Sequence, residues 1–129
     1  YRDMDVSALG YEKGVTPFLD IQASIALDIT IEGIESASLS SGAGIVSGKA
    51  YDDIDAQMVD METFAIKRCC MQHDIPMIGL RGISDGKEEL KVLTDWTQYL
   101  ELIDEKLAQA VDQLEQAVLN NSIVIITKN

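Results

Sequence analysis

Val59-Asp60-Met61-Glu62 and Arg81-Gly82-Ile83-Ser84-Asp85-Gly86 are the segments that decide the fold of this chain. The first ends a short apolar strand and leads into a helix predicted over 63–73, and the second ends a nearly continuous apolar strand. Parallel strands joined by a helix bring their carboxyl ends to one edge of a sheet, where α/β folds bind ligands. Glu62 and Asp85 are therefore expected a ligand's width apart.

Length and composition indicate a single globular domain. The chain has 129 residues, 47% hydrophobic and 25% charged, which is enough for one modest core and too few for two. Its net charge of -12 argues against nucleic acid or an anionic membrane as a partner, since both attract basic surfaces. No apolar run has the length of a transmembrane helix, and no signal-peptide pattern opens the chain.

Cysteine and histidine usage indicates a cytoplasmic protein without a metal site. The only cysteines, Cys69 and Cys70, are neighbours on the predicted helix, so their side chains point in different directions and a disulfide between them is not expected. Reduced thiols are typical of a cytoplasmic protein. One histidine and two adjacent cysteines do not suit structural zinc, and we expect no cofactor.

The N-terminal third is predicted to contain two strands separated by a long loop. Residues 1–9 are expected to form a strand that runs into this loop. The loop over 10–20 carries Pro17 and bulky apolar neighbours, which favours a subunit contact over a plug on its own core. Residues 21–34 indicate a helical turn followed by a short strand.

A glycine-containing turn is predicted between the next strand and a helix. Residues 37–41 are β-compatible and end at Ser41-Gly42-Ala43-Gly44, ahead of a helix over 45–54. Backbone amides in such a turn would face a ligand, and a base or sugar suits it better than phosphate, because the lysine of a nucleotide loop is absent. A plain tight turn explains the glycines about as well.

The C-terminal third is predicted to be one long amphipathic helix. Asp95 and Gln98 have the spacing of a capping box. Apolar residues recur at helical spacing from Trp96 to Val118, so this helix is expected to cover the sheet. It is expected to end at Asn120-Asn121, before a short β-like segment over 123–126.

The acids at the two strand ends suit different chemistry. Glu62 lies near a helix N-terminus, where negative charge is stabilised, so it would stay ionised and could accept two hydrogen bonds from a vicinal diol. A plain helix cap is the alternative, and spacing alone favours it. Asp85 follows an apolar strand whose burial would favour the protonated form, so it suits a general acid that Ser84 orients. A turn begun with Gly86 is about equally supported.

Arg81 interrupts the apolar strand that precedes Asp85. A buried guanidinium needs a carboxylate or several carbonyls as partners. We expect it to pair with an acid of this region, and the sequence does not distinguish which one.

Together, the stretch from Val59 to Ala65 and the stretch from Arg81 to Asp85 resemble the purine nucleoside phosphorylase and nucleosidase superfamily. In particular, the chain resembles the nucleosidases of 5′-methylthioadenosine and S-adenosylhomocysteine within this superfamily. The resemblance implies a three-layer α/β/α fold with a mixed, largely parallel sheet. It also implies that residues 1–119 are a C-terminal portion whose N-terminal strands lie outside this chain, that 120–129 form a tail, and that the protein is a homodimer.

The resemblance also implies roles for the matching residues. Glu62 would bind the ribose hydroxyls and Met61 would pack on the sugar, with Val59 and Asp60 completing this part of the substrate site. Asp85, held by Ser84, would protonate N7 of the leaving adenine.

The remaining implied contacts concern the base and the 5′ substituent. Ile45 and Val46 would hold the base through backbone groups and apolar contact. Leu9 and Pro17 would reach across a dimer interface to the neighbouring site. The family usually has an acid at the position of Ala43 and an aromatic that stacks on adenine at the position of Ile45. Without these two side chains, the resemblance defines the preferred base less closely.

These observations favour hydrolysis of the N-glycosidic bond of an adenine nucleoside with a 5′-thio substituent. The alternatives are a phosphorylase that uses phosphate as nucleophile, and a nucleoside-binding relative without catalysis. The glutamate that activates water in the family belongs to its N-terminal part, so this chain alone is expected to be catalytically incomplete.

Overall fold

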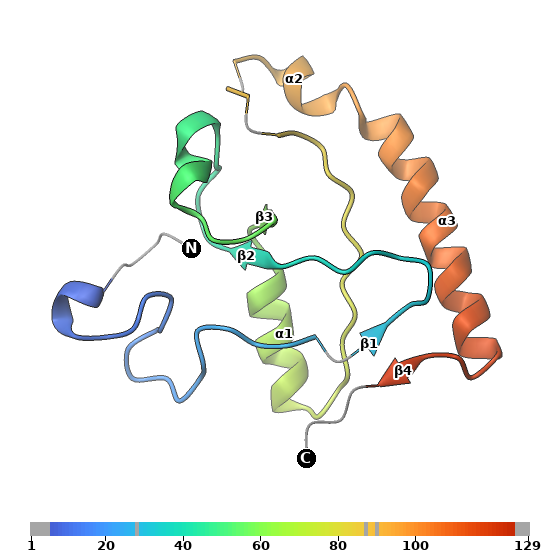
Figure 1. Ribbon diagram of the computed structural model, residues 1–129, viewed down its shortest axis with the longest axis horizontal. Coiled ribbons are helices and arrows are strands. Elements are labelled where there is room, and N and C mark those ends of the chain that lie inside the picture. Colours follow the sequence, from blue (N-terminus) through green and yellow to red (C-terminus); the bar gives the residue numbers. More distant parts are fainter. Residues whose placement is uncertain (1–5, 28, 87, 90, 126–129) are drawn as a thin grey trace.

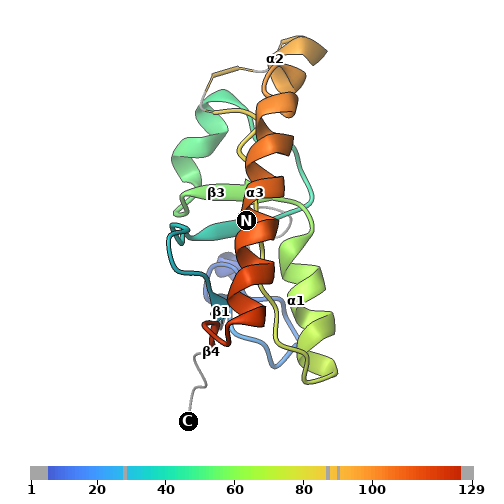
Figure 2. The ribbon, with the colours of Figure 1, turned by 90° about the vertical axis from the view of Figure 1, so that its right-hand side faces the viewer.

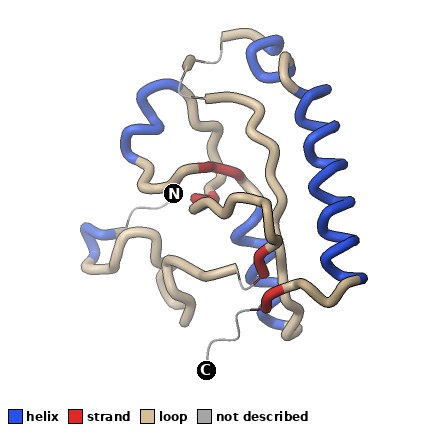
Figure 3. The backbone as a smooth tube through the Cα atoms, turned by 45° about the vertical axis from the view of Figure 1, so that its right-hand side comes forward, coloured by secondary structure: helices blue, strands red, loops and turns tan. Residues whose placement is uncertain are grey.

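The computed structural model describes residues 6–27, 29–86, 88–89 and 91–125. Its elements in chain order are the 3-10 helix η1 (Ser7–Leu9), β1 (Ile29–Thr30), β2 (Leu39–Ser41), the 3-10 helix η2 (Gly48–Asp53), β3 (Met58–Asp60), α1 (Thr63–Gln72), α2 (Leu93–Thr97), α3 (Leu100–Leu119) and β4 (Val124–Ile125). Long loops connect these short elements (Figure 3). The chain is thus an α/β structure with little regular sheet.

The strands β2 and β3 form a parallel pair at the centre of the structure (Figure 1). Their register places Ser41 beside Asp60, and the crossover between them contains η2. Helix α1 follows β3 directly and lies against this pair, as a strand–helix unit requires. The strand predictions over 37–41 and 58–61 and the helix prediction over 63–73 are therefore confirmed within a few residues.

A second pair joins distant parts of the chain. Strand β1 pairs antiparallel with β4, with Thr30 opposite Val124. This confirms the short strands predicted within 21–34 and 123–126, although residue 126 lies outside the described residues. The helical turn predicted before β1 is wrong. Residues 21–27 alternate between half-buried and exposed, which is the burial period of extended chain rather than of a helix.

The strand predicted over 75–84 is absent. This segment has no regular secondary structure and runs extended between α1 and α3 (Figures 1 and 2). No strand among the described residues is hydrogen-bonded to it, since the parallel sheet contains only β2 and β3. Two of its glycines lie close to other parts of the chain instead: a Cβ atom added at Gly82 would overlap Ile103 of α3, and one added at Gly79 would lie 3.7 Å from Leu27 Cδ1. Any proximity of Glu62 and Asp85 therefore depends on side-chain contacts rather than on paired strand ends.

Two predictions in the first half of the chain are also corrected. The described part of the strand predicted over 1–9 is η1, closed by Gly10, whose amide donates to the Ser7 carbonyl at 2.9 Å; residues 1–5 lie outside the described residues. The helix predicted over 45–54 is only the 3-10 helix η2. Ser47 is extended and Gly48 has a φ of 55°, so a regular α-helix cannot pass through these residues.

The long C-terminal helix is divided in two. Helix α2 begins at Leu93, so Asp95 lies inside it and not at the N-cap position that was predicted. Tyr99, with φ -107° and ψ 1°, separates α2 from α3. The amphipathic face is confirmed in α3, where Ile103, Leu107 and Leu114 are half-buried.

The apolar core of the described residues is small. Only Ile31, Val46 and Ala117 are buried apolar side chains there. None of the described helices is both long and apolar enough to cross a membrane.

The Gly82→Ala variant is expected to be less stable than the parent chain by about 1–3 kcal/mol. A Cβ atom at Gly82 would overlap Ile103 Cγ2 and lie 3.4 Å from Leu107 Cδ1, so α3 would have to move. Chemical denaturation measures the loss. Gly86→Ala is the matched control, because no described residue has an atom within 4 Å of its added Cβ. Equal stability of the two variants would contradict the close approach of α3.

Candidate functional site

The carboxylate of Asp60 is the centre of a hydrogen-bond network at the end of β3. Ser41 Oγ donates to Asp60 Oδ1 at 2.5 Å, and the Thr63 amide donates to Oδ2 at 2.9 Å. The hydroxyl of Thr63 and the guanidinium of Arg81 also donate to Oδ2. The Asp60 side chain is only 7% exposed. The register of β2 and β3 creates this network, because it sets Ser41 beside Asp60.

The environment of Asp60 holds its pKa below the ordinary value of 3.8. Burial alone raises the pKa of this carboxyl, because desolvation penalises the charged form. Hydrogen bonds from Ser41 and Thr63, together with the charge of Arg81, outweigh that effect. Asp60 is thus a stable anion at the strand end.

Arg81 connects the segment 75–86 to this strand end. Its Nη2 atom pairs with Asp60 and donates to Thr63 Oγ1 at 2.5 Å, while its Nη1 atom lies 3.9 Å from Glu62 Oε2. The acid partner that the sequence left open is therefore Asp60, with Glu62 as a more distant second. The ion pairs bring Glu62 near the segment that carries Asp85, although no strand pairing does so.

Glu62 occupies the N-cap position of α1 without capping the helix. Its side chain makes no capping hydrogen bond and is 60% exposed. The first amides of α1 are satisfied by other groups: Thr63 N donates to Asp60, and Phe64 N donates to Ser41 Oγ at 3.0 Å. The capping alternative is therefore wrong for this side chain, and the carboxylate faces solvent where a diol could reach it.

Each carboxyl oxygen of Asp85 accepts a hydrogen bond. Ser84 Oγ donates to Oδ1 at 2.6 Å, which confirms the predicted contact between these neighbours. Tyr51 Oη donates to Oδ2 at 3.3 Å. Asp85 is half-buried at the end of an irregular segment rather than of a buried strand. Sequence reasoning missed Tyr51, because the only signal was an aromatic residue in the crossover between β2 and β3.

The other predicted site residues are dispersed. Ile45 is 82% exposed whereas its neighbour Val46 is 5% exposed, so the two side chains point in opposite directions and Val46 belongs to the core. Leu9 is 75% exposed, and Pro17 is half-buried. Within the described residues, no hydrogen bond or ion pair joins Leu9, Pro17 or Ile45 to the acids.

Met61 and Val59 flank Asp60 at the strand end. Met61 is 49% exposed, and its amide donates to Glu62 Oε2 at 3.3 Å. Val59 is half-buried within β3. The exposed thioether beside an exposed carboxylate is compatible with packing on a sugar.

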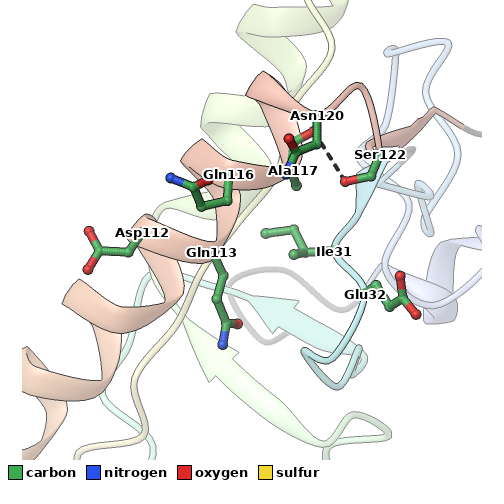
Figure 4. Close-up of a pocket in the computed structure, with 8 residues that line it drawn as sticks. All are labelled: Ile31, Glu32, Asp112, Gln113, Gln116, Ala117, Asn120 and Ser122. Carbon is green, nitrogen blue, oxygen red and sulfur yellow. Dashed lines mark hydrogen bonds between the residues drawn. The ribbon is translucent and has the colours of Figure 1, made fainter.

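Two open cavities lie away from the predicted site residues. The larger, of about 430 Å³, lies between the end of α3 and the chain after β1 (Figure 4) and is lined by Ile31, Glu32, Asp112, Gln113, Gln116, Ala117, Asn120 and Ser122. The smaller, of about 250 Å³, is lined by Gly48, Lys49, Asp52 and Glu89 beside η2. In the part of the chain that the structure describes, no cluster of three or more potential metal ligands occurs.

Comparison with known proteins identifies related sequences. Residues 40–120 match the sequence profile described as "Phosphorylase superfamily". The chain is 28% identical to the 5′-methylthioadenosine/S-adenosylhomocysteine nucleosidase of Glaesserella parasuis, over 94% of this chain and 57% of that protein. It is 32% identical to the Haemophilus influenzae protein of the same name, over 67% of this chain and 44% of the relative, and 31% identical to that of Staphylococcus carnosus, over 66% and 44%. The chain thus spans about half the length of the curated relatives it matches.

Proposed function

The chain belongs to the phosphorylase superfamily, and on this premise we propose that the complete protein is a nucleosidase that hydrolyses the N-glycosidic bond of adenine nucleosides with a 5′-thio substituent. The relatives that it resembles are named as nucleosidases of 5′-methylthioadenosine and S-adenosylhomocysteine. One observation carries the assignment. Arg81 pairs with Asp60 and lies 3.9 Å from Glu62, which ties the strand end that bears Glu62 to the segment that bears the hydrogen-bonded Asp85.

The proposed chemistry divides the two acids by role. Asp85, oriented by Ser84, gives a proton to the departing adenine, so the base leaves as a neutral molecule when the C–N bond breaks. Glu62 accepts hydrogen bonds from the ribose hydroxyls and stabilises the oxocarbenium character of the sugar. Water then attacks the anomeric carbon and releases a proton, which replaces the proton that Asp85 gave to the base. The ion pairs of Arg81 with Asp60 and Glu62 hold the segment that carries Asp85 next to the strand end that carries Glu62.

The same proposal extends to assembly and architecture. A homodimer is supported by the exposed apolar side chains of Leu9 in η1 and Phe18 in the following loop, at 75% and 98% exposure, which a second subunit would cover. The parallel β2–β3 pair with α1 against it is compatible with a three-layer α/β/α fold for the complete protein. A small nucleoside as ligand and a cytoplasmic location agree with the net charge of -12 and with the free thiols of Cys69 and Cys70.

Adenine release from methylthioadenosine by the protein at its full natural length tests this function. We expect release that is equally fast with and without inorganic phosphate, because water is the nucleophile. Strict dependence on phosphate would instead identify a phosphorylase, which the name of the superfamily keeps as the second candidate. Binding of adenosine analogues without any cleavage would contradict both enzymatic assignments.

A further inference from the structure

Asp85 is held by two hydroxyl groups that come from different parts of the chain. Ser84 is its immediate neighbour, whereas Tyr51 is 34 residues earlier in the sequence, on η2. A single donor fixes one carboxyl oxygen and leaves the carboxyl plane able to rotate. Donors on both Oδ1 and Oδ2 define the plane itself. The orientation of Asp85 therefore depends on Tyr51 as well as on Ser84.

The main chain around Tyr51 is fixed by its own hydrogen bonds. The Ile54 amide donates to the Tyr51 carbonyl at 3.2 Å, and the Ala50 amide donates to the Ser47 carbonyl at 3.2 Å, so η2 is closed on both sides of Tyr51. The tyrosine is half-buried, which limits the motion of its ring. Its hydroxyl thus reaches Asp85 from the crossover between β2 and β3, a part of the chain distant in sequence from Ser84.

The two contacts differ in length, so the two carboxyl oxygens of Asp85 are held with different firmness. The short bond of 2.6 Å from Ser84 marks Oδ1 as the firmly held acceptor. The longer contact of 3.3 Å from Tyr51 holds Oδ2 less tightly. A tyrosine hydroxyl can donate or accept a hydrogen bond, so Tyr51 can stay hydrogen-bonded to Oδ2 both before and after Asp85 gives up its proton. A phenylalanine at position 51 would keep the ring and lose the hydrogen bond to Asp85 Oδ2.

We propose that Tyr51 is a positioning residue that orients Asp85 Oδ2 towards the leaving base, an inference that rests on the proposed nucleosidase function. The proton passes from Asp85 to the base nitrogen, the glycosidic electron pair stays with the base, and Tyr51 then donates to the Asp85 carboxylate that remains. Tyr51 takes no proton from the substrate and forms no bond to it.

The test compares two substrates with the full-length protein and its Tyr51→Phe variant. One is methylthioadenosine, whose adenine must be protonated to leave. The other is a 4-nitrophenyl riboside with the same 5′-thio group, whose nitrophenolate leaves without a proton. We expect kcat for methylthioadenosine to fall roughly tenfold at unchanged KM, and kcat for the nitrophenyl riboside to stay within about twofold. Tyr99→Phe, which removes a hydroxyl at the N-cap of α3, is the matched control and should affect neither substrate.

Each other outcome has a distinct meaning. Equal losses on both substrates would overturn the positioning role, because a merely structural defect lowers both rates. Unchanged cleavage of methylthioadenosine by Tyr51→Phe would overturn it as well, while leaving the nucleosidase assignment intact. A parent protein that does not cleave methylthioadenosine would overturn the proposed function, and the role of Tyr51 with it. Thermal unfolding of Tyr51→Phe, checked alongside, should match that of Tyr99→Phe.

Discussion

The Asp85→Asn variant of the full-length protein is expected to release adenine from methylthioadenosine about 10²–10⁴ times more slowly than the parent protein. Asparagine has nearly the same shape and can keep contacts with Ser84 and Tyr51, but its amide cannot supply a proton to the departing base. The loss should appear in kcat, because the acid acts in the transition state rather than in binding. Steady-state kinetics with adenine detection measure it.

Asp55→Asn provides the control for this loss. Asp55 is an exposed acid just before β3, and its replacement changes the net charge by the same amount. We expect it to retain the parental rate. Full activity of Asp85→Asn would eliminate Asp85 as the general acid, whatever the identity of the substrate. A similar loss in both variants would assign the effect to overall charge instead.

The Asp60→Asn variant is expected to lower the free energy of unfolding by roughly 2–3 kcal/mol at neutral pH. It replaces an anion that is 7% exposed, and it places an amide that donates hydrogen bonds among the donors of Ser41, Thr63 and Arg81. Arg81 is 33% exposed, so water recovers part of its loss and the expected cost lies at or below the lower end of the range for broken buried pairs. Urea denaturation measures the change, and Asp104→Asn on the exposed side of α3 should leave stability unaltered.

The stability difference between the parent protein and Asp60→Asn is expected to depend on pH. The folded-state pKa of Asp60 lies below its ordinary value of 3.8, so folding favours the ionised form. The stabilisation from this group is present above pH 3.8 and is lost as the pH falls through the lower folded-state pKa. The stability difference between parent and Asp60→Asn should therefore be constant near neutrality and shrink below pH 3.8. A difference that grows on acidification would contradict the sign of this pKa shift.

Local signals predicted the elements whose formation depends on adjacent residues. The strand at Met58–Asp60 and the helix at Thr63–Gln72 follow from a short apolar run and from helical periodicity. The amphipathic face of α3 was predictable for the same reason. Its break at Tyr99 was not, because the periodicity continues across that residue while the backbone leaves the helical region.

Longer-range predictions depended on partners that the sequence does not reveal. The segment 75–84 has the composition of a central strand, but a strand also needs a neighbour with which to exchange hydrogen bonds. Pairing of β1 with β4 likewise joins residues nearly a hundred positions apart. Sequence patterns identify candidate strands, whereas the choice of partner is decided by the folded chain.

In the candidate site, too, contacts between adjacent residues were predictable and contacts between distant residues were not. The contact of Ser84 with Asp85 was predictable because the two residues are adjacent. The choice of Asp60 as the partner of Arg81, and the approach of Tyr51 to Asp85, depend on side chains 21 and 34 residues apart. The substrate roles of Leu9, Pro17, Ile45 and Val46 stay predictions, and the burial of Val46 gives it a structural task in addition.

The network around Asp60 has a consequence for folding kinetics. Its contacts with Ser41 and Arg81 close loops of 19 and 21 residues, and loop closure costs entropy before either contact contributes. The acidic strand end is therefore expected to form late during folding, after β2 and β3 have met. Interactions formed after the transition state slow unfolding without accelerating folding. A nucleoside bound as proposed across Glu62 and Asp85 would stabilise the folded chain further, because only the folded chain holds these two acids in place.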